Sequence, residues 1–142
     1  GAIKKAEEFA RKIGKDLAII AKRRKSDTEV EVTQFIGDVK GKTVLIVDDL
    51  TESAGTLVQA AKECRANGAT RVICAVSHNC LTPLGYRRIA SARNTGDIDV
   101  FIASTSAGMT EFPTVVTDID VSPLFGEAIL KIHNNESVSE LF

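Results

Sequence analysis

The residues best suited to chemistry lie together in one short stretch of the sequence. Asp48 and Asp49 directly follow the apolar run 44–47. Small and hydroxyl residues come next, namely Ser53, Ala54, Gly55 and Thr56. Carboxylates can accept hydrogen bonds from sugar hydroxyls or hold a hydrated magnesium ion. A small-residue loop before a helix offers backbone N–H groups and a helix dipole to a phosphate. The order of these groups predicts a sugar phosphate as ligand.

The elements around this stretch follow from its apolar pattern. The unbroken, β-branched run 44–47 predicts a strand buried on both faces of a sheet. Leu57, Ala60, Ala61 and Cys64 recur at helical spacing and predict a helix after the loop. Each feature alone has a simpler explanation, because any strand-to-helix turn needs small residues and Thr56 can be an ordinary N-cap. Only the combination is specific.

A basic triplet precedes this stretch. Lys22, Arg23 and Arg24 follow the short apolar strand predicted at 17–20, and the polar residues 25–28 come after them. An isolated basic run usually forms a solvated surface. Next to a phosphate site it can instead form a cationic lid, because phosphoryl transfer builds charge that Lys or Arg must neutralise while water is excluded.

A histidine ends another predicted strand. The apolar run 71–76 is followed by Ser77 and His78. A lone histidine is more often structural than functional, but one at the end of a strand in an α/β sheet faces the ligand crevice. Since Lys22, Asp48 and His78 each end a predicted strand, we expect them to share one edge of the sheet, with His78 as a neighbour of the site.

The remaining pattern alternates helices and strands in one domain, residues 1–142. It predicts an α/β fold with a mostly parallel sheet flanked by helices on both faces. In the closing helix, Ser122 is the expected N-cap and Pro123 the first helical residue. Further elements are expected at 2–13, 29–36, 81–92 (from near Pro83), 99–103, 114–119 and 121–132, with one more turn in 136–142.

Composition narrows the class of protein. The chain has 142 residues, of which 44% are hydrophobic and 26% charged, as is ordinary for one globular domain. A net charge of −1 gives no electrostatic reason to expect binding to nucleic acid or an acidic membrane. Cys64, Cys74 and Cys80 lack the spacing of a zinc site and are expected to be free thiols. The sequence shows neither a membrane-spanning apolar run nor a signal peptide, so we expect a cytoplasmic protein.

The central stretch, TVLIVDDLTESAGT, resembles the phosphoribosyl pyrophosphate motif. That motif has an apolar strand, two acids, two variable residues, an acid, and then Ser/Thr, Ala/Gly, Gly and Thr. Type I phosphoribosyltransferases and ribose-phosphate diphosphokinases share it. The triplet at 22–24 and the ending IHNNESVSELF resemble the diphosphokinases, as the C-terminal half of that family. The resemblance implies a type I phosphoribosyltransferase-like fold and an absent N-terminal half.

The resemblance also implies an activity. In the family, the anomeric hydroxyl of ribose 5-phosphate attacks the β-phosphorus of magnesium-bound ATP, which gives phosphoribosyl pyrophosphate and AMP. By resemblance, Lys22 and Arg24 are catalytic and stabilise the transferring group. The 5-phosphate is held by Glu52, Ser53, Ala54, Gly55 and Thr56. Asp48 and Asp49 hold the ribose hydroxyls and help to organise the magnesium ion. The family forms homo-oligomers, usually hexamers.

Two departures from the family pattern keep other functions open. Glu52 stands where most relatives have Asp, and Thr51 is polar where an apolar or small residue is common. A non-catalytic regulatory homologue is one alternative, although Lys22 and Arg24 are retained. A phosphoribosyltransferase or phosphoribosyl pyrophosphate-binding regulator is another, although no hood segment for a base is evident. A two-component receiver domain is excluded, because the later strands end in Ser and not in a phosphoacceptor Asp. The isolated chain is expected to be inactive, since the family's first half supplies much of the ATP site.

Overall fold

The computed structural model describes residues 2–24, 30–108, 111 and 114–141, apart from the side chains of residues 2, 3, 5, 21–24 and 30–34. The elements in chain order are α1 (Ala2–Lys12), β1 (Ile19–Arg24), β2 (Val30–Ile36), β3 (Thr43–Thr51), α2 (Gly55–Ala66), β4 (Arg71–Asn79), α3 (Pro83–Asn94), β5 (Val100–Ser104), β6 (Thr117–Ile119), α4 (Ser122–His133) and the 3-10 turn η1 (Ser139–Leu141). Every helix and strand expected from the sequence overlaps a described element, although β1 extends beyond the strand expected at 17–20 and β6 is shorter than the one expected at 114–119. Residues 25–29, which include most of the predicted lid, lie outside the described residues.

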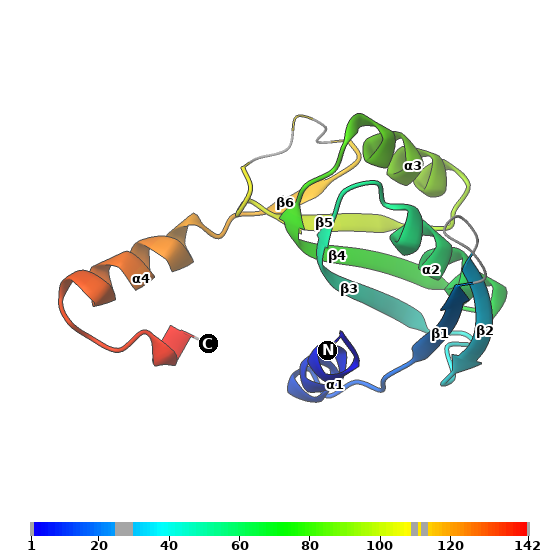
Figure 1. Cartoon of the computed structure of the whole chain (residues 1–142), viewed down its shortest axis with the longest axis horizontal. Coiled ribbons are helices and arrows are strands. Elements are labelled where there is room, and N and C mark those ends of the chain that lie inside the picture. Colours follow the sequence, from blue (N-terminus) through cyan, green and yellow to red (C-terminus); the bar gives the residue numbers. More distant parts are fainter. Residues whose placement is uncertain (1, 25–29, 109–110, 112–113, 142) are drawn as a thin grey trace.

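The main sheet is parallel and runs in chain order. Its four strands are arranged β3-β4-β5-β6, and α2 and α3 form the first two crossovers (Figure 1). Parallel neighbours need such crossovers, because a tight turn can only join antiparallel strands. The register pairs Ile46 with Cys74 and Cys74 with Phe101. This arrangement confirms the predicted α/β class.

The core lies between one face of this sheet and the helices α2 and α3. Val72, Cys74 and Val76 of β4 project toward the helices and are almost fully buried, as is Phe101 of β5. Ala61 on α2 and Ile89 on α3 are fully buried against them. Burial of each such side chain stabilises the fold by about 1.5–3 kcal/mol. This packing fixes which residues of β3 and β4 face the helices.

The opposite face of β3 is open, and the expectation that this strand is buried on both faces was wrong. Leu45 and Val47 are 41% and 44% exposed, whereas Val44 and Ile46 on the other face pack against the core. The two exposed side chains project from the face opposite α2 and α3, and β3 is an edge strand of the sheet. Apolar composition cannot distinguish one covered face from two.

The first two strands form a separate sheet. β1 and β2 pair as an antiparallel hairpin, with an irregularity between Ala21 and Lys22. The hairpin lies at the end of the molecule where β3 begins (Figure 1). The expectation that Lys22 ends a strand of the main sheet was therefore wrong: Lys22 lies inside β1, and β1 pairs only with β2. A local antiparallel pairing closes with a short connection and needs no crossover.

Helix α4 extends away from the sheet (Figure 1). It buries none of its residues, and Ile129 is 67% exposed. Val121 and not Ser122 is the N-cap. Asp120, the residue before the N-cap, accepts from Ser122 N through Oδ1 at 2.9 Å. Hydrogen bonds from Ser122 lower the pKa of Asp120. Among the described residues, no helix combines the length and apolar character needed to cross a membrane.

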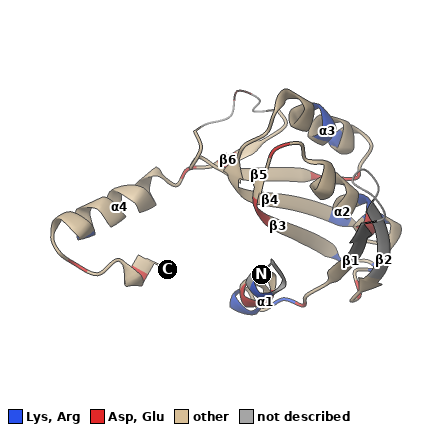
Figure 2. Cartoon of the chain, viewed as in Figure 1, with Lys and Arg blue, Asp and Glu red and all other residues tan. Residues whose placement is uncertain are grey.

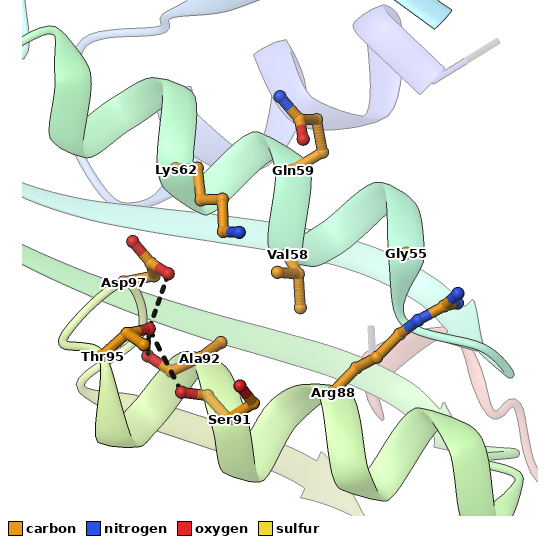
Figure 3. Close-up of a pocket in the computed structure, with 9 residues that line it drawn as sticks. All are labelled: Gly55, Val58, Gln59, Lys62, Arg88, Ser91, Ala92, Thr95 and Asp97. Atoms are coloured by element: carbon orange, nitrogen blue, oxygen red, sulfur yellow. Dashed lines mark hydrogen bonds between the residues drawn. The ribbon is translucent and has the colours of Figure 1, made fainter. Parts of the chain in front are cut away.

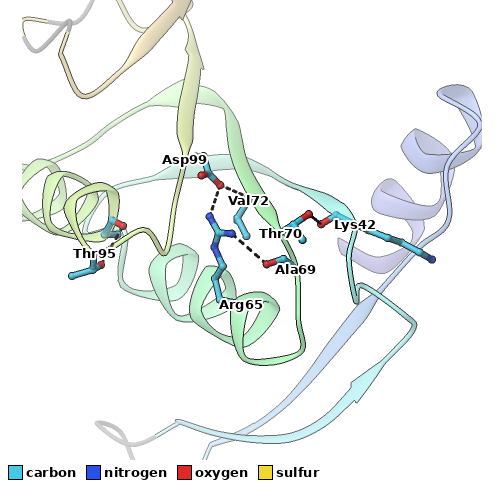
Figure 4. A network of polar contacts seen from close by, with 8 residues as sticks. Lys42, Arg65, Ala69, Thr70, Val72, Thr95 and Asp99 are labelled. Atoms are coloured by element: carbon cyan, nitrogen blue, oxygen red, sulfur yellow. Dashed lines mark hydrogen bonds and ion pairs between the residues drawn. The ribbon is translucent and has the colours of Figure 1, made fainter.

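One ion pair ties α2 to the start of β4 and β5 (Figure 4). Asp99 Oδ2 accepts from Arg65 Nη2 at 2.5 Å and from the backbone N of Val72 at 2.6 Å. Arg65 Nη1 also donates to the carbonyl of Ala69 at 3.3 Å. A single carboxylate thus satisfies a strand N–H group and holds the C-terminal turn of the helix.

We expect Asp99→Ala to lower the free energy of unfolding by about 2 kcal/mol, because it leaves a partly buried N–H group and a guanidinium without their shared acceptor. Urea denaturation followed by circular dichroism measures this change. Asp16→Ala is the control, since the Asp16 side chain is 96% exposed and its loss is expected to cost less than about 0.5 kcal/mol. Equal stability of the two variants would show that the Asp99 contacts contribute nothing.

The three cysteines are free, as expected, and differ in accessibility. Cys64 and Cys74 are buried, and burial raises the pKa of Cys74 to about 12. Cys80 is exposed. Only a thiolate attacks a disulfide reagent. At pH 8 we therefore expect one thiol per folded chain to react rapidly with Ellman's reagent and all three to react in denaturant. Rapid reaction of any thiol in the folded Cys80→Ser variant would contradict this packing.

Candidate functional site

The two acids lie inside β3 and not beyond its end. The sequence placed the end of the strand at Val47, but β3 continues to Thr51. Asp48 Oδ1 accepts from the N of Asp49 at 2.9 Å, and Asp49 Oδ1 accepts from the N of Leu50 at the same distance. Both acids are exposed near the C-terminal end of β3 (Figure 2). Each still has oxygen lone pairs directed to solvent and available to a ligand.

The acids project to opposite faces of the sheet. Asp48 is in register with Val76, whose side chain is buried under the helices. Asp49, the next residue along the strand, therefore lies on the open face. Among the described residues, no three His, Cys, Asp or Glu side chains are grouped to hold a metal ion. The donor set still fits magnesium, which prefers oxygen and is often bound through one or two carboxylates, with water and substrate phosphates completing its shell.

The loop after β3 ends in an uncapped helix start. Ala54 is the N-cap of α2, with φ 56° and ψ 9°, and within the described part of the chain the helix has no side-chain capping hydrogen bond. Thr56 is therefore not the N-cap that its type allows. The first N–H groups of a helix have no partner within the helix. Their free hydrogens and the positive end of the helix dipole form a place where an anion can bind.

Two carbonyl groups of the loop accept hydrogen bonds from α3 and its N-cap residue. The carbonyl of Glu52 accepts from Thr82 N at 3.0 Å and from Thr82 Oγ1 at 3.3 Å. The carbonyl of Ser53 accepts from Arg88 Nη1 at 3.0 Å. Sequence reasoning missed both residues. The pair Thr82-Pro83 is a typical helix start, which the structure uses, but nothing in the sequence marked Arg88.

A groove of about 360 Å³ separates α2 from α3 (Figure 3). Val58 and Lys62 line it from α2, and Ser91 and Arg88 from α3. Arg88 extends along the end of the groove toward Gly55 (Figure 3). A Cβ atom on Gly55 would lie 3.3 Å from Arg88 Nη1, so glycine leaves room for this arginine. The groove thus lies between α2 and α3, next to the C-terminal end of the loop.

His78 lies on the neighbouring strand, close to the acids. It pairs in register with Leu50, two residues after Asp48. Its Nδ1 lies 2.7 Å from Ser106 Oγ. Ser106 Oγ also donates to the carbonyl of Ser77 at 2.9 Å. The histidine is thus held by a serine from the segment after β5, which the sequence did not single out.

The basic triplet is not brought to this edge. Lys22 and Arg24 belong to the β1–β2 hairpin, which lies toward the start of β3, whereas Asp48 lies toward its end (Figure 1). The side chains of both basic residues lie outside the described part of the chain. The expected juxtaposition of Lys22, Asp48 and His78 is therefore only partly present, with the last two on adjacent strands of one sheet.

These features define a class. In this parallel α/β sheet an acidic pair, a small-residue loop and the start of α2 follow one another, in the order that the phosphoribosyl pyrophosphate motif predicts. Residues 25–142 match the family described as the phosphoribosyl synthetase-associated domain, and the chain belongs to that family.

Several curated proteins named ribose-phosphate pyrophosphokinase are similar to this chain. The whole chain is 38% identical to a ribose-phosphate pyrophosphokinase of Thermosipho africanus and covers 44% of it. It is 37% identical to that of Campylobacter jejuni, covering 45%, and 39% identical to that of Chlorobaculum tepidum, covering 43%. The structure is similar to the crystal structure of phosphoribosylpyrophosphate synthetase from Mycobacterium smegmatis, with a TM-score of 0.74 and 28% identity over 93% of this chain and 42% of that one. The chain thus spans less than half the length of these relatives.

The left-handed conformation of Ala54 can be tested by substitution. Ala54 is 2% exposed, so a branched side chain there would be both strained and crowded. We expect Ala54→Val to lower the free energy of unfolding by more than about 2 kcal/mol, and Ala54→Gly to stay within about 1 kcal/mol of the parent. Urea denaturation measures both. The control Ala66→Val, at an exposed position of α2, should cost only about 0.6 kcal/mol. A harmless Ala54→Val would argue against this loop conformation.

Proposed function

We propose that this chain is the ribose 5-phosphate-binding part of a ribose-phosphate diphosphokinase. The observation that carries the proposal is the uncapped start of α2 beside the exposed acids of β3. A phosphate and a ribose ring are joined by one methylene group, so one ligand can occupy both features at once. The names of the relatives support this choice of ligand.

In this proposal the loop Glu52–Thr56 holds the 5-phosphate. The N–H groups at the start of α2 donate to the phosphate oxygens, and Ser53 and Thr56 add hydroxyl donors. Asp48 and Asp49 accept hydrogen bonds from the ribose hydroxyls. The two carboxylates lie on opposite faces of the sheet. Asp48 shares its face with α2, whose first N–H groups bind the phosphate, so we assign the ring hydroxyls chiefly to Asp48.

Magnesium, ATP and the catalytic cations complete the proposed reaction. The anomeric hydroxyl of the bound sugar attacks the β-phosphorus of ATP, and AMP leaves. Magnesium bound through Asp48 or Asp49 would neutralise charge on the phosphate oxygens. Lys22 and Arg24 are the proposed cations for the transferring group. Their distance from the acids requires the hairpin to move, or the hairpin of another copy to reach this site.

The wider assignments are also part of the proposal. We assign the chain to the C-terminal half of the relatives, because the ending IHNNESVSELF resembles theirs. A homo-oligomer is supported by the exposed apolar side chains of α4, among them Ile129 and Phe125. We further propose a cytoplasmic location, where ATP and sugar phosphates occur. His78 is proposed as a neighbour of the sugar and not as a catalytic residue.

The test is calorimetric titration of the 142-residue chain with ribose 5-phosphate and, separately, with inorganic phosphate. We expect ribose 5-phosphate to bind more tightly than phosphate. Asp48→Asn should raise the dissociation constant for ribose 5-phosphate roughly 10- to 100-fold, because a carboxylate that accepts from hydroxyl groups contributes about 1.5–3 kcal/mol. Its circular dichroism spectrum should be unchanged, since Asp48 is exposed.

Asp16→Asn removes the same charge from an exposed side chain before β1 and should bind as the parent does. The proposal fails if ribose 5-phosphate binds no better than phosphate, or if Asp48→Asn retains full affinity. An unfolded Asp48→Asn variant would instead show that this acid is structural.

A further inference from the structure

We propose that Arg88 is a positioning residue for the phosphate-binding loop. This role rests on the proposed function, because it concerns how the loop is prepared for phosphate. Arg88 reaches from the middle of α3 to the loop on a different element and donates to the carbonyl of Ser53 at 3.0 Å. The guanidinium thus binds the side of the loop that cannot itself bind an anion.

The need for such a contact follows from the geometry of the loop. In a peptide unit the N–H and the C=O point in opposite directions. If the carbonyls of residues 52 and 53 turned toward the ligand, they would present negative charge to a phosphate. Arg88 and Thr82 hold these two carbonyls toward α3. The N–H groups that follow are then left facing the other side, where α2 begins.

The loop also carries backbone strain that something must offset. Ala54 follows the two carbonyls that Thr82 and Arg88 hold, and it precedes α2. Its backbone is in the left-handed region, with φ 56°. That conformation is unfavourable for an L residue. A hydrogen bond from a charged donor stabilises the folded state enough to offset it. Loss of the Arg88 contact should therefore let the loop leave this conformation for part of the time.

We call the contacts of Thr82 and Arg88 with these two carbonyls the clamp. The start of α3 packs closely against the loop at this place. A Cβ atom on Gly85 would lie 2.2 Å from the carbonyl oxygen of Glu52, so the helix backbone approaches the loop more closely than any side chain would allow. Gly85 N donates to Thr82 Oγ1 at 3.2 Å and holds that hydroxyl in place. Arg88, one helical turn after Gly85, adds the second contact. The two contacts fix two successive carbonyls.

Ligand-free hydrogen exchange tests the clamp itself. We expect Arg88→Met, which keeps the aliphatic stem, to increase the amide exchange rates of Thr82 and Val58 on the order of tenfold relative to the parent, because their N–H groups donate to the loop carbonyls of Glu52 and Ala54. Arg88→Lys retains one donor within reach of the carbonyl and should restore much of the protection. Arg87→Met changes the exposed neighbour on the same helix and should leave these rates unchanged. A residue that only bound phosphate directly would not alter the ligand-free loop.

Calorimetry with inorganic phosphate and ribose 5-phosphate then tests the consequence for binding. Arg88→Met should weaken both ligands by the same factor, roughly tenfold, because both use the loop. Asp48→Asn should weaken ribose 5-phosphate alone. Unchanged exchange rates in Arg88→Met would overturn the positioning role, whatever the affinities. If the parent binds neither ligand but the exchange rates change as expected, the clamp holds and the proposed function fails.

Discussion

The burial of one face of the parallel sheet under α2 and α3 is the constraint on which the rest of the structure depends. Val72, Cys74 and Phe101 are fully buried there, and they fix the register of β4 and β5. Because side chains alternate along a strand, a shift of one residue would turn this apolar set to solvent. The same register decides that Asp48 leaves β3 on the helix side and Asp49 on the open side.

The packing of the sheet against α2 and α3 also determines the geometry of the candidate site. The loop after β3 connects a strand and a helix whose relative positions the core already fixes, so its few residues have little freedom. The left-handed Ala54 is the price of that short connection. Contacts from Thr82 and Arg88 then decide which way the loop carbonyls point. Phosphate binding at this place would thus depend on α3 as much as on the motif itself.

Much of the fold could be predicted from the sequence, because its signals are local. Runs such as 71–76 read as strands, and Thr82-Pro83 marks a helix start that the structure shows. The wrong predictions concern which elements pack against a strand or pair with it. Residues 44–47 are as apolar as a strand covered on both faces, yet Leu45 and Val47 face solvent. Nothing in a sequence states whether a second layer covers a strand.

The candidate site shows the same division. The acids and the small-residue loop could be found from residue types. The acids act through their own carboxylates, and the small residues of the loop leave backbone N–H groups accessible. Arg88 could not, because its contribution is a contact with a carbonyl 35 residues earlier in the chain. Lys22 was assigned to the wrong sheet for a related reason. A short apolar run beside a turn suits a parallel edge strand and an antiparallel hairpin equally, and only the pairing energy of the folded chain selects between them.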